Sequence, residues 1–155
     1  GEPYYSSEPE MYLSTLVHEF NHSFVNPLAD NPTFASKIEP AGNAMLTYSR
    51  KVMRRNAYST WQNLVNESIV RAAVIIYLMD DDVPQDKIRQ GVIDEMSVGF
   101  YWTPDLVKIL QDYIRHRDTY PTIDSYYSEI ADFFNNYANS CSRKIDSIFP
   151  DNQQH

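Results

Sequence analysis

Apolar residues recur along this chain mostly at intervals of three and four positions, which is the spacing of one face of an α-helix. The pattern predicts six helices, over about residues 9–24, 40–55, 59–80, 84–98, 103–118 and 122–138. A loop and a short helix are expected between the first two, and only the aromatic segment 99–102 could be extended. We therefore expect a mainly α fold, in which residues 1–155 form one compact helical domain with little or no sheet.

The first predicted helix separates its apolar residues from two histidines. At 100° per residue, one stripe holds Leu13, Leu16, Val17, Phe20 and Phe24. His18 and His22 are one turn apart on the opposite side, with Glu19 beside them. The two histidines therefore face either a cleft or bulk solvent, and they are not core residues.

His18, Glu19 and His22 form the pattern H-E-x-x-H. Two histidines at positions i and i+4 direct their ring nitrogens at one point and can bind a zinc ion at about 2 Å. The glutamate beside the first histidine can then act as general base on a water that the metal activates. The alternative is that both histidines are simply solvated on an amphipathic helix.

A catalytic zinc site needs a third protein ligand. The continuation H-E-x-x-H-x-x-G-x-x-H is excluded, because Val25 and Leu28 occupy its glycine and last histidine positions. A site with three histidines would depend on His116, so a carboxylate is the better candidate.

Glu67, in the third predicted helix, is the carboxylate we select as third ligand. The second half of that helix is apolar nearly all round, which indicates burial, and a carboxylate at its upstream edge needs a partner. Zinc would serve as that partner. Arg71 is the alternative, because it lies four residues later, at the favourable spacing for an ion pair.

Two short motifs resemble known families. "HEFNH", followed by "NESIVRA" on a later helix, resembles the gluzincin zinc metallopeptidases, and "HEFNHSFVNP" resembles a family of uncharacterised bacterial proteins described only as a domain of unknown function. The gluzincin resemblance implies that His18, His22 and Glu67 bind zinc and that Glu19 is the general base. Many gluzincins carry an acidic residue four positions after the ligand glutamate, where this chain has Arg71, so the acceptor that orients His18 stays unassigned.

Hydrolysis of an amide also requires a hydrogen-bond donor for the oxyanion that develops during the reaction. Tyr101, Tyr120, His116 and Arg117 are chemically able to donate. We select Tyr101 in "GFYW" as the catalytic donor, while a packed aromatic turn is the alternative interpretation of that segment.

Charge and chain organisation limit the possible partners. The chain has 21 acidic and 13 basic residues and a net charge of −8, so nucleic acid is an unlikely partner. The longest apolar run, residues 68–79, is too short to span a bilayer, and the single cysteine, Cys141, cannot form an internal disulfide. Few residues precede the first helix, so the substrate-binding sheet that such peptidases usually carry has no room here. We expect this chain to be the C-terminal catalytic part of a larger protein, with the upstream part as a partner.

These observations together predict a zinc-dependent metallopeptidase that hydrolyses peptide bonds in a peptide or protein substrate. The alternative is a non-catalytic helical interaction domain with a degenerate or structural zinc site. The first residue is Gly, as in a processed product, and the segment "GEPYYSSEPE" lacks the features of a signal peptide. We expect an extracellular or periplasmic location, with any export signal lost from the start of the chain.

Overall fold

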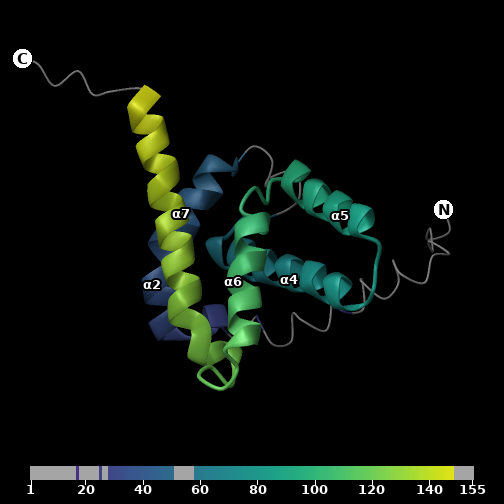
Figure 1. Cartoon of the computed structure of the whole chain (residues 1–155). Helices are drawn as coiled ribbons and strands as arrows, with labels where there is room; N and C mark the ends of the chain where they lie inside the picture. Colours follow the sequence, from purple (N-terminus) through teal and green to yellow (C-terminus); the bar gives the residue numbers. More distant parts are fainter. Residues whose placement is uncertain (1–16, 18–24, 26–27, 51–57, 149–155) are drawn as a thin grey trace, which may run out of the picture.

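The computed structural model describes residues 28–50 and 58–148, together with Val17 and Val25, and Figure 1 shows how the helices are arranged. The elements are α2 (Pro32–Tyr48), α4 (Trp61–Asp80), α5 (Gln85–Ser97), α6 (Thr103–Arg115), the short 3-10 helix η2 (Ile123–Tyr126) and α7 (Tyr127–Ile148). No strand occurs among these described residues, which confirms the mainly α fold. The predicted helix over residues 9–24 lies outside the described residues, apart from Val17.

Helix α2 continues through Pro40, where the sequence pattern predicted that a new helix would begin. Its start is well capped, because the side-chain oxygen of Asn31 accepts hydrogen bonds from the backbone N–H groups of Thr33 and Phe34 at 2.9 and 3.4 Å. The buried stripe spans the proline and comprises Phe34, Ile38, Ala41, Gly42 and Met45. The predicted boundary is therefore wrong: the packing of one continuous face outweighs the helical hydrogen bond that a proline removes.

Helix α4 contacts α2, α5 and α6. Thr60 caps its start by accepting a hydrogen bond from the backbone of Asn63 at 3.2 Å. Every residue from Leu64 to Val70 is buried, whereas Tyr77 and Leu78 near the end are only partly buried. Burial is thus densest in the first half of the helix, whereas the apolar pattern alone predicted that the second half would be buried.

The segment 99–102 is a turn between α5 and α6 and not an extended strand. Gly99 has φ of 107°, a conformation that strongly favours glycine, and the backbone of Phe100 donates to the carbonyl of Glu95 at 3.0 Å. The turn directs Phe100 and Trp102 into the core and leaves Tyr101 exposed. It therefore carries two aromatic anchors between the helices.

Helix α7 packs mainly along α2 and ends at Ile148, about three turns beyond the predicted end at residue 138. In Figure 1 its last turns extend beyond the other helices, and the side chain of Ile148 is exposed. The extra turns are rich in polar residues, so apolar periodicity could not detect them. None of the described helices is long and apolar enough to cross a membrane.

Candidate functional site

The predicted site residues fall into two groups. His18, Glu19 and His22 lie outside the described residues, so their predicted roles stay predictions. Glu67 and Tyr101 are described, and their surroundings can be examined directly. The described part of the site therefore centres on Glu67 and helix α4.

Glu67 lies in the first half of α4 and is only 6% exposed. A carboxylate at such a position needs hydrogen bonds or an opposite charge, because burial removes its hydration. Its Oε1 atom accepts a hydrogen bond from Nε of Arg71 at 2.8 Å, one helical turn later. The ion pair that the sequence offered as the alternative partner of Glu67 is thus present.

Arg71 connects α4 to two further segments. Its guanidinium donates to Glu95 on α5 and to the hydroxyl of Tyr58 at 3.0 Å, and it lies 4.7 Å from the ring centroid of Phe100. Burial of the guanidinium disfavours its charged form and by itself lowers the pKa of Arg71. The hydrogen bond to Glu95 and the charges of Glu95 and Glu67 outweigh this effect, so the pKa of Arg71 is raised above its usual value. The guanidinium therefore stays charged at any physiological pH.

We refer to Tyr58, Glu67, Arg71 and Glu95 as the Arg71 cluster. Two carboxylates in this cluster share one guanidinium, so the cluster has a net negative charge when both acids are ionised. Burial also raises the pKa of the Tyr58 hydroxyl, which therefore remains a neutral hydrogen-bond partner.

Asn66, the residue before Glu67, has an unusual environment. Its side chain is 9% exposed, and its Oδ1 atom is fully buried without a hydrogen-bond donor among the described residues. The neighbouring polar residue Ser68 is satisfied, because its hydroxyl donates to the carbonyl of Leu64 at 2.6 Å and accepts from the indole N–H of Trp102 at 2.8 Å. An unpaired buried acceptor beside a buried carboxylate marks this part of α4 as a candidate site.

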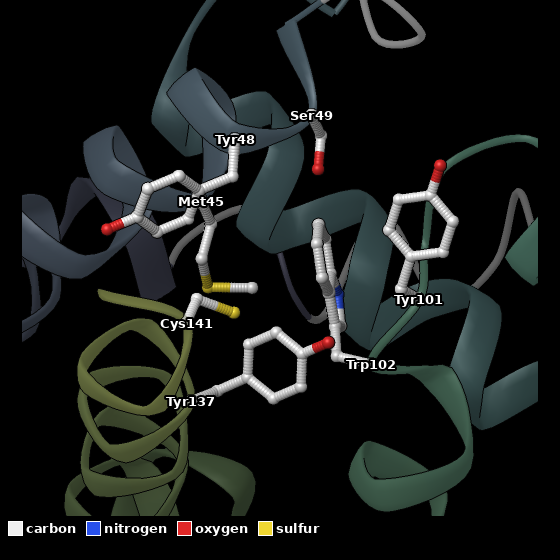
Figure 2. A pocket seen from close by; sticks show the side chains of 7 residues that line it. All are labelled: Met45, Tyr48, Ser49, Tyr101, Trp102, Tyr137 and Cys141. Carbon is white, nitrogen blue, oxygen red and sulfur yellow. The ribbon is translucent and has the colours of Figure 1, made fainter. Parts of the chain in front are cut away.

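Tyr101, the predicted oxyanion donor, is 47% exposed and takes no part in the hydrogen bonds that Arg71 makes. Figure 2 shows it on one side of Trp102, with Tyr137 and Cys141 on the other. These residues line a cavity of about 60 Å³ together with Met45, Tyr48 and Ser49. Burial raises the pKa of the Tyr137 hydroxyl, which therefore stays neutral at physiological pH.

His116 ends helix α6 at an exposed position. Its Nδ1 atom lies 2.9 Å from the carbonyl oxygen of Asp112, where it completes the end of the helix. Among residues 28–50 and 58–148, no three side chains of the His, Cys, Asp or Glu type are grouped closely enough to hold a metal. A site with three protein ligands that includes Glu67 therefore needs at least one ligand from outside these residues.

Sequence reasoning missed Asn66, Tyr58 and Glu95. The last two reach Arg71 from 13 and 24 residues away, and no local spacing rule connects residues so distant along the chain. A signal for Asn66 did exist, because it is an amide within a helix segment whose other residues are mostly apolar. Buried amides usually have a specific hydrogen-bond partner.

Comparison with known proteins gives one match. The model of a family described as Domain of unknown function (DUF4932) matches residues 9–133, a range that includes the H-E-x-x-H motif, the Arg71 cluster and Tyr101. No curated protein and no solved structure matches the chain.

Proposed function

We propose that this chain, which belongs to the DUF4932 family, is a zinc-dependent metallopeptidase domain in which His18, His22 and Glu67 bind the metal. The observation that carries the proposal is the burial of the Glu67 carboxylate on α4, where it shares the Arg71 guanidinium with a second carboxylate, Glu95. The H-E-x-x-H motif supplies the two remaining ligands by sequence.

The described residues fit a zinc ion in their donor chemistry. Zinc accepts carboxylate oxygen alongside imidazole nitrogen, and a carboxylate can hold an ion pair and a metal at the same time, because its two oxygens offer several lone pairs. The buried Oδ1 atom of Asn66, the residue before Glu67, is unpaired among the described residues, and residues that bind a metal usually have hydrogen-bond partners around them.

In this mechanism a bound zinc ion would activate a water molecule and polarise the scissile carbonyl. Glu19 takes a proton from the attacking water and delivers it to the leaving amine. Tyr101 donates a hydrogen bond to the oxygen that becomes negative, and its exposed hydroxyl leaves it accessible to a substrate. Arg71 holds Glu67 in one orientation through its contacts with α5 and Tyr58.

The substrate in this proposal is a peptide or protein, and an upstream part of the same polypeptide contributes to binding it. An extracellular or periplasmic location belongs to the same proposal. The acidic net charge of −8 makes nucleic acid an unsuitable ligand.

A second candidate function is a non-catalytic helical interaction domain. The specific observation in its favour is the ion pair between Glu67 and Arg71, which gives the buried carboxylate a partner without any metal. In that case the Arg71 cluster only connects α4 to α5 and to Tyr58.

Metal analysis separates the two candidates. Purified protein dialysed against trace zinc should retain about one zinc ion per chain, and Glu67→Ala should lower its zinc affinity at least 100-fold. Glu39→Ala, a change at an exposed acid on α2, is the matched control and should leave zinc affinity unchanged. Absence of zinc from the wild-type chain would refute the proposal and favour the interaction domain.

Hydrolysis of a casein or peptide mixture, measured with the upstream part of the polypeptide present, tests the peptidase step. Glu19→Gln should keep the zinc and lose turnover, because an amide cannot accept the proton of the attacking water. Undiminished hydrolysis by Glu19→Gln would remove Glu19 from the role of general base.

A further inference from the structure

The cavity beside Trp102 has the features of a small binding site (Figure 2). Three parts of the chain line it, namely the end of α2 (Met45, Tyr48, Ser49), the turn before α6 (Tyr101, Trp102) and helix α7 (Tyr137, Cys141). We propose that this cavity binds a primary alkylammonium group, such as the end of a lysine side chain. The proposal involves neither the H-E-x-x-H motif nor a metal, and it stands or falls independently of the peptidase.

Ser49 is a buried residue whose hydroxyl group lacks a partner. The residue is only 4% exposed, and its Oγ atom makes no hydrogen bond among the described residues, whereas the buried hydroxyl of Ser68 both donates and accepts. Figure 2 shows the Ser49 oxygen directed toward Trp102, with which it lines the cavity. Because buried hydroxyl groups usually have a partner, this one indicates a ligand with a hydrogen-bonding group.

Tyr137 provides a second hydroxyl group for the same cavity. Its oxygen is also directed toward Trp102 in Figure 2, and it too makes no hydrogen bond among the described residues. The ring centroids of Tyr137 and Trp102 are 5.8 Å apart, with an angle of 71° between the ring planes. Trp102 is only 2% exposed and is held in place by the hydrogen bond of its indole N–H to Ser68 at 2.8 Å. The cavity therefore has a fixed aromatic wall with two acceptor oxygens beside it.

The electrostatics of the lining favour a cation. None of the seven lining residues is Lys, Arg, His, Asp or Glu, and the faces of aromatic rings attract a cation at distances up to about 6 Å. Burial is the main cause that raises the pKa of the Tyr137 hydroxyl, and the charge of Asp105 on α6 adds to it. Negative potential from that acid thus reaches Tyr137. The net charge of −8 also attracts cations to the chain as a whole.

The size of the cavity and its two oxygens limit the kind of cation. The volume is about 60 Å³, and since one water molecule needs roughly 10–15 Å³, the cavity has room for about four water-sized groups. The last methylene groups and the nitrogen of a lysine side chain fit this space. An ammonium nitrogen with its N–H donors can pair with both Ser49 and Tyr137. A quaternary ammonium has no N–H group and would leave both oxygens unpaired.

The experiment titrates the isotope-labelled chain with n-butylammonium chloride at pH 7 and follows the NMR signal of the Trp102 indole N–H. Butan-1-ol is the matched neutral ligand, because it has the same alkyl chain and a hydroxyl in place of the charge. Saturable shifts are expected with both ligands. The affinity for n-butylammonium should be at least about 10-fold higher, because only the cation is attracted by the rings and by Asp105.

Two variants test the assigned contacts. Ser49→Ala and Tyr137→Phe each remove one hydroxyl and keep the rest of the side chain, and each should weaken binding of n-butylammonium about 10-fold. Ser36→Ala, at an exposed position on α2, is the matched control and should leave the affinity unchanged. The thermal midpoint of each variant shows that it is folded. A purely structural Ser49 would change that midpoint and not the affinity.

A further comparison identifies the source of the ammonium group. A capped Gly-Lys-Gly peptide that binds more tightly than n-butylammonium, while the same peptide with norleucine does not bind, would assign the cavity to a lysine side chain of a polypeptide. Binding of n-butylammonium without binding of the peptide would assign it to a small free amine.

The proposal is overturned if n-butylammonium produces no saturable shift, or if butan-1-ol binds equally well, which would make the cavity a neutral apolar pocket. It is also overturned if Ser49→Ala and Tyr137→Phe both leave the affinity at the wild-type value. None of these results bears on zinc binding, which is measured separately.

Discussion

Removal of the Arg71 guanidinium should destabilise the protein far more than removal of an exposed cation. The substitution Arg71→Met keeps an unbranched apolar stem and deletes the guanidinium that lies over Phe100 and pairs with Glu67 and Glu95. Two carboxylates would then lose the cation that they share, and one of them, Glu67, is buried. The loss comes from the groups left without partners and not only from the hydrogen bonds removed.

The magnitude follows from the burial of the cluster. Removal of one partner of a fully buried ion pair costs about 3–5 kcal/mol. The side chains of Arg71 and Glu95 are each 22% exposed, so water can compensate for part of the loss at Glu95. We expect a decrease of about 3 kcal/mol in the free energy of unfolding, out of a total of roughly 5–15 kcal/mol for a domain. The thermal midpoint should fall by about 6–12 °C.

Urea unfolding of the metal-free protein at pH 7, followed by circular dichroism, measures this change. Lys108→Met is the matched control, because it also removes a cation from an ion pair, here with Asp105 on α6, where both side chains are more than half exposed. An exposed pair of this kind contributes about 0–1 kcal/mol. The difference between the two variants isolates the effect of burial.

A combined variant tests the physical cause. In a background that carries Glu67→Gln and Glu95→Gln, Arg71 has lost both charged partners and is itself a buried unpaired charge. Arg71→Met should then cost almost nothing or should stabilise the protein. The reasoning is refuted if Arg71→Met costs the same in both backgrounds, or if it costs no more than Lys108→Met.

Two further predictions concern packing and pH. Gly42→Ala should destabilise the protein by about 1–2 kcal/mol in urea unfolding, because its new methyl group would lie 3.0 Å from Cβ of Trp61. Gly91→Ala is the control: its methyl group meets only the end of a flexible side chain, so it should be neutral or slightly stabilising. Equal effects of the two substitutions would contradict the packing argument. Burial and the hydrogen bond to Asp112 raise the pKa of Tyr126 to about 12, so its contribution to stability is complete below about pH 10 and lost as the pH rises from 10 to 12. Unfolding measured from pH 8 to 12 should show a smaller decline for Tyr126→Phe than for the wild type, and parallel curves would contradict the assignment.

The sequence predicted those parts of the fold that depend on local periodicity. The helices over residues 61–80, 85–97 and 103–115 lie within one to three residues of their predicted limits, because apolar spacing and helix ends agree there. The helix start predicted at Pro40 is wrong. A proline indicates only the local cost of a lost helical hydrogen bond, and not the packing energy of the buried residues that precede and follow it on the same helix face. The polar end of α7 was missed because it buries little and so shows no apolar pattern.

In the candidate site, too, contacts within one helix could be predicted from the sequence and contacts between segments could not. The spacing between Glu67 and Arg71 indicated their ion pair directly, since both residues lie on one helix. The contributions of Tyr58 and Glu95 depend on how α4 meets other segments, which no pattern within one helix encodes. The turn at residues 99–102 was ambiguous because aromatic residues suit both strands and packed turns, and only the positive φ of Gly99 settles it.

The positions of the two tryptophans allow intrinsic fluorescence to report on separate helix contacts. Trp61 packs against the backbone of α2 at Gly42, whereas the indole of Trp102 bonds to Ser68 on α4 and lies 5.8 Å from the ring centroid of Tyr137 on α7. Each residue therefore senses a different pair of helices. In variants that retain only one tryptophan, fluorescence emission would reveal whether the contact between α2 and α4 and the contact with α7 separate together or in sequence during unfolding. No external dye is needed, because both indoles pass from a buried environment to water when their own contact opens.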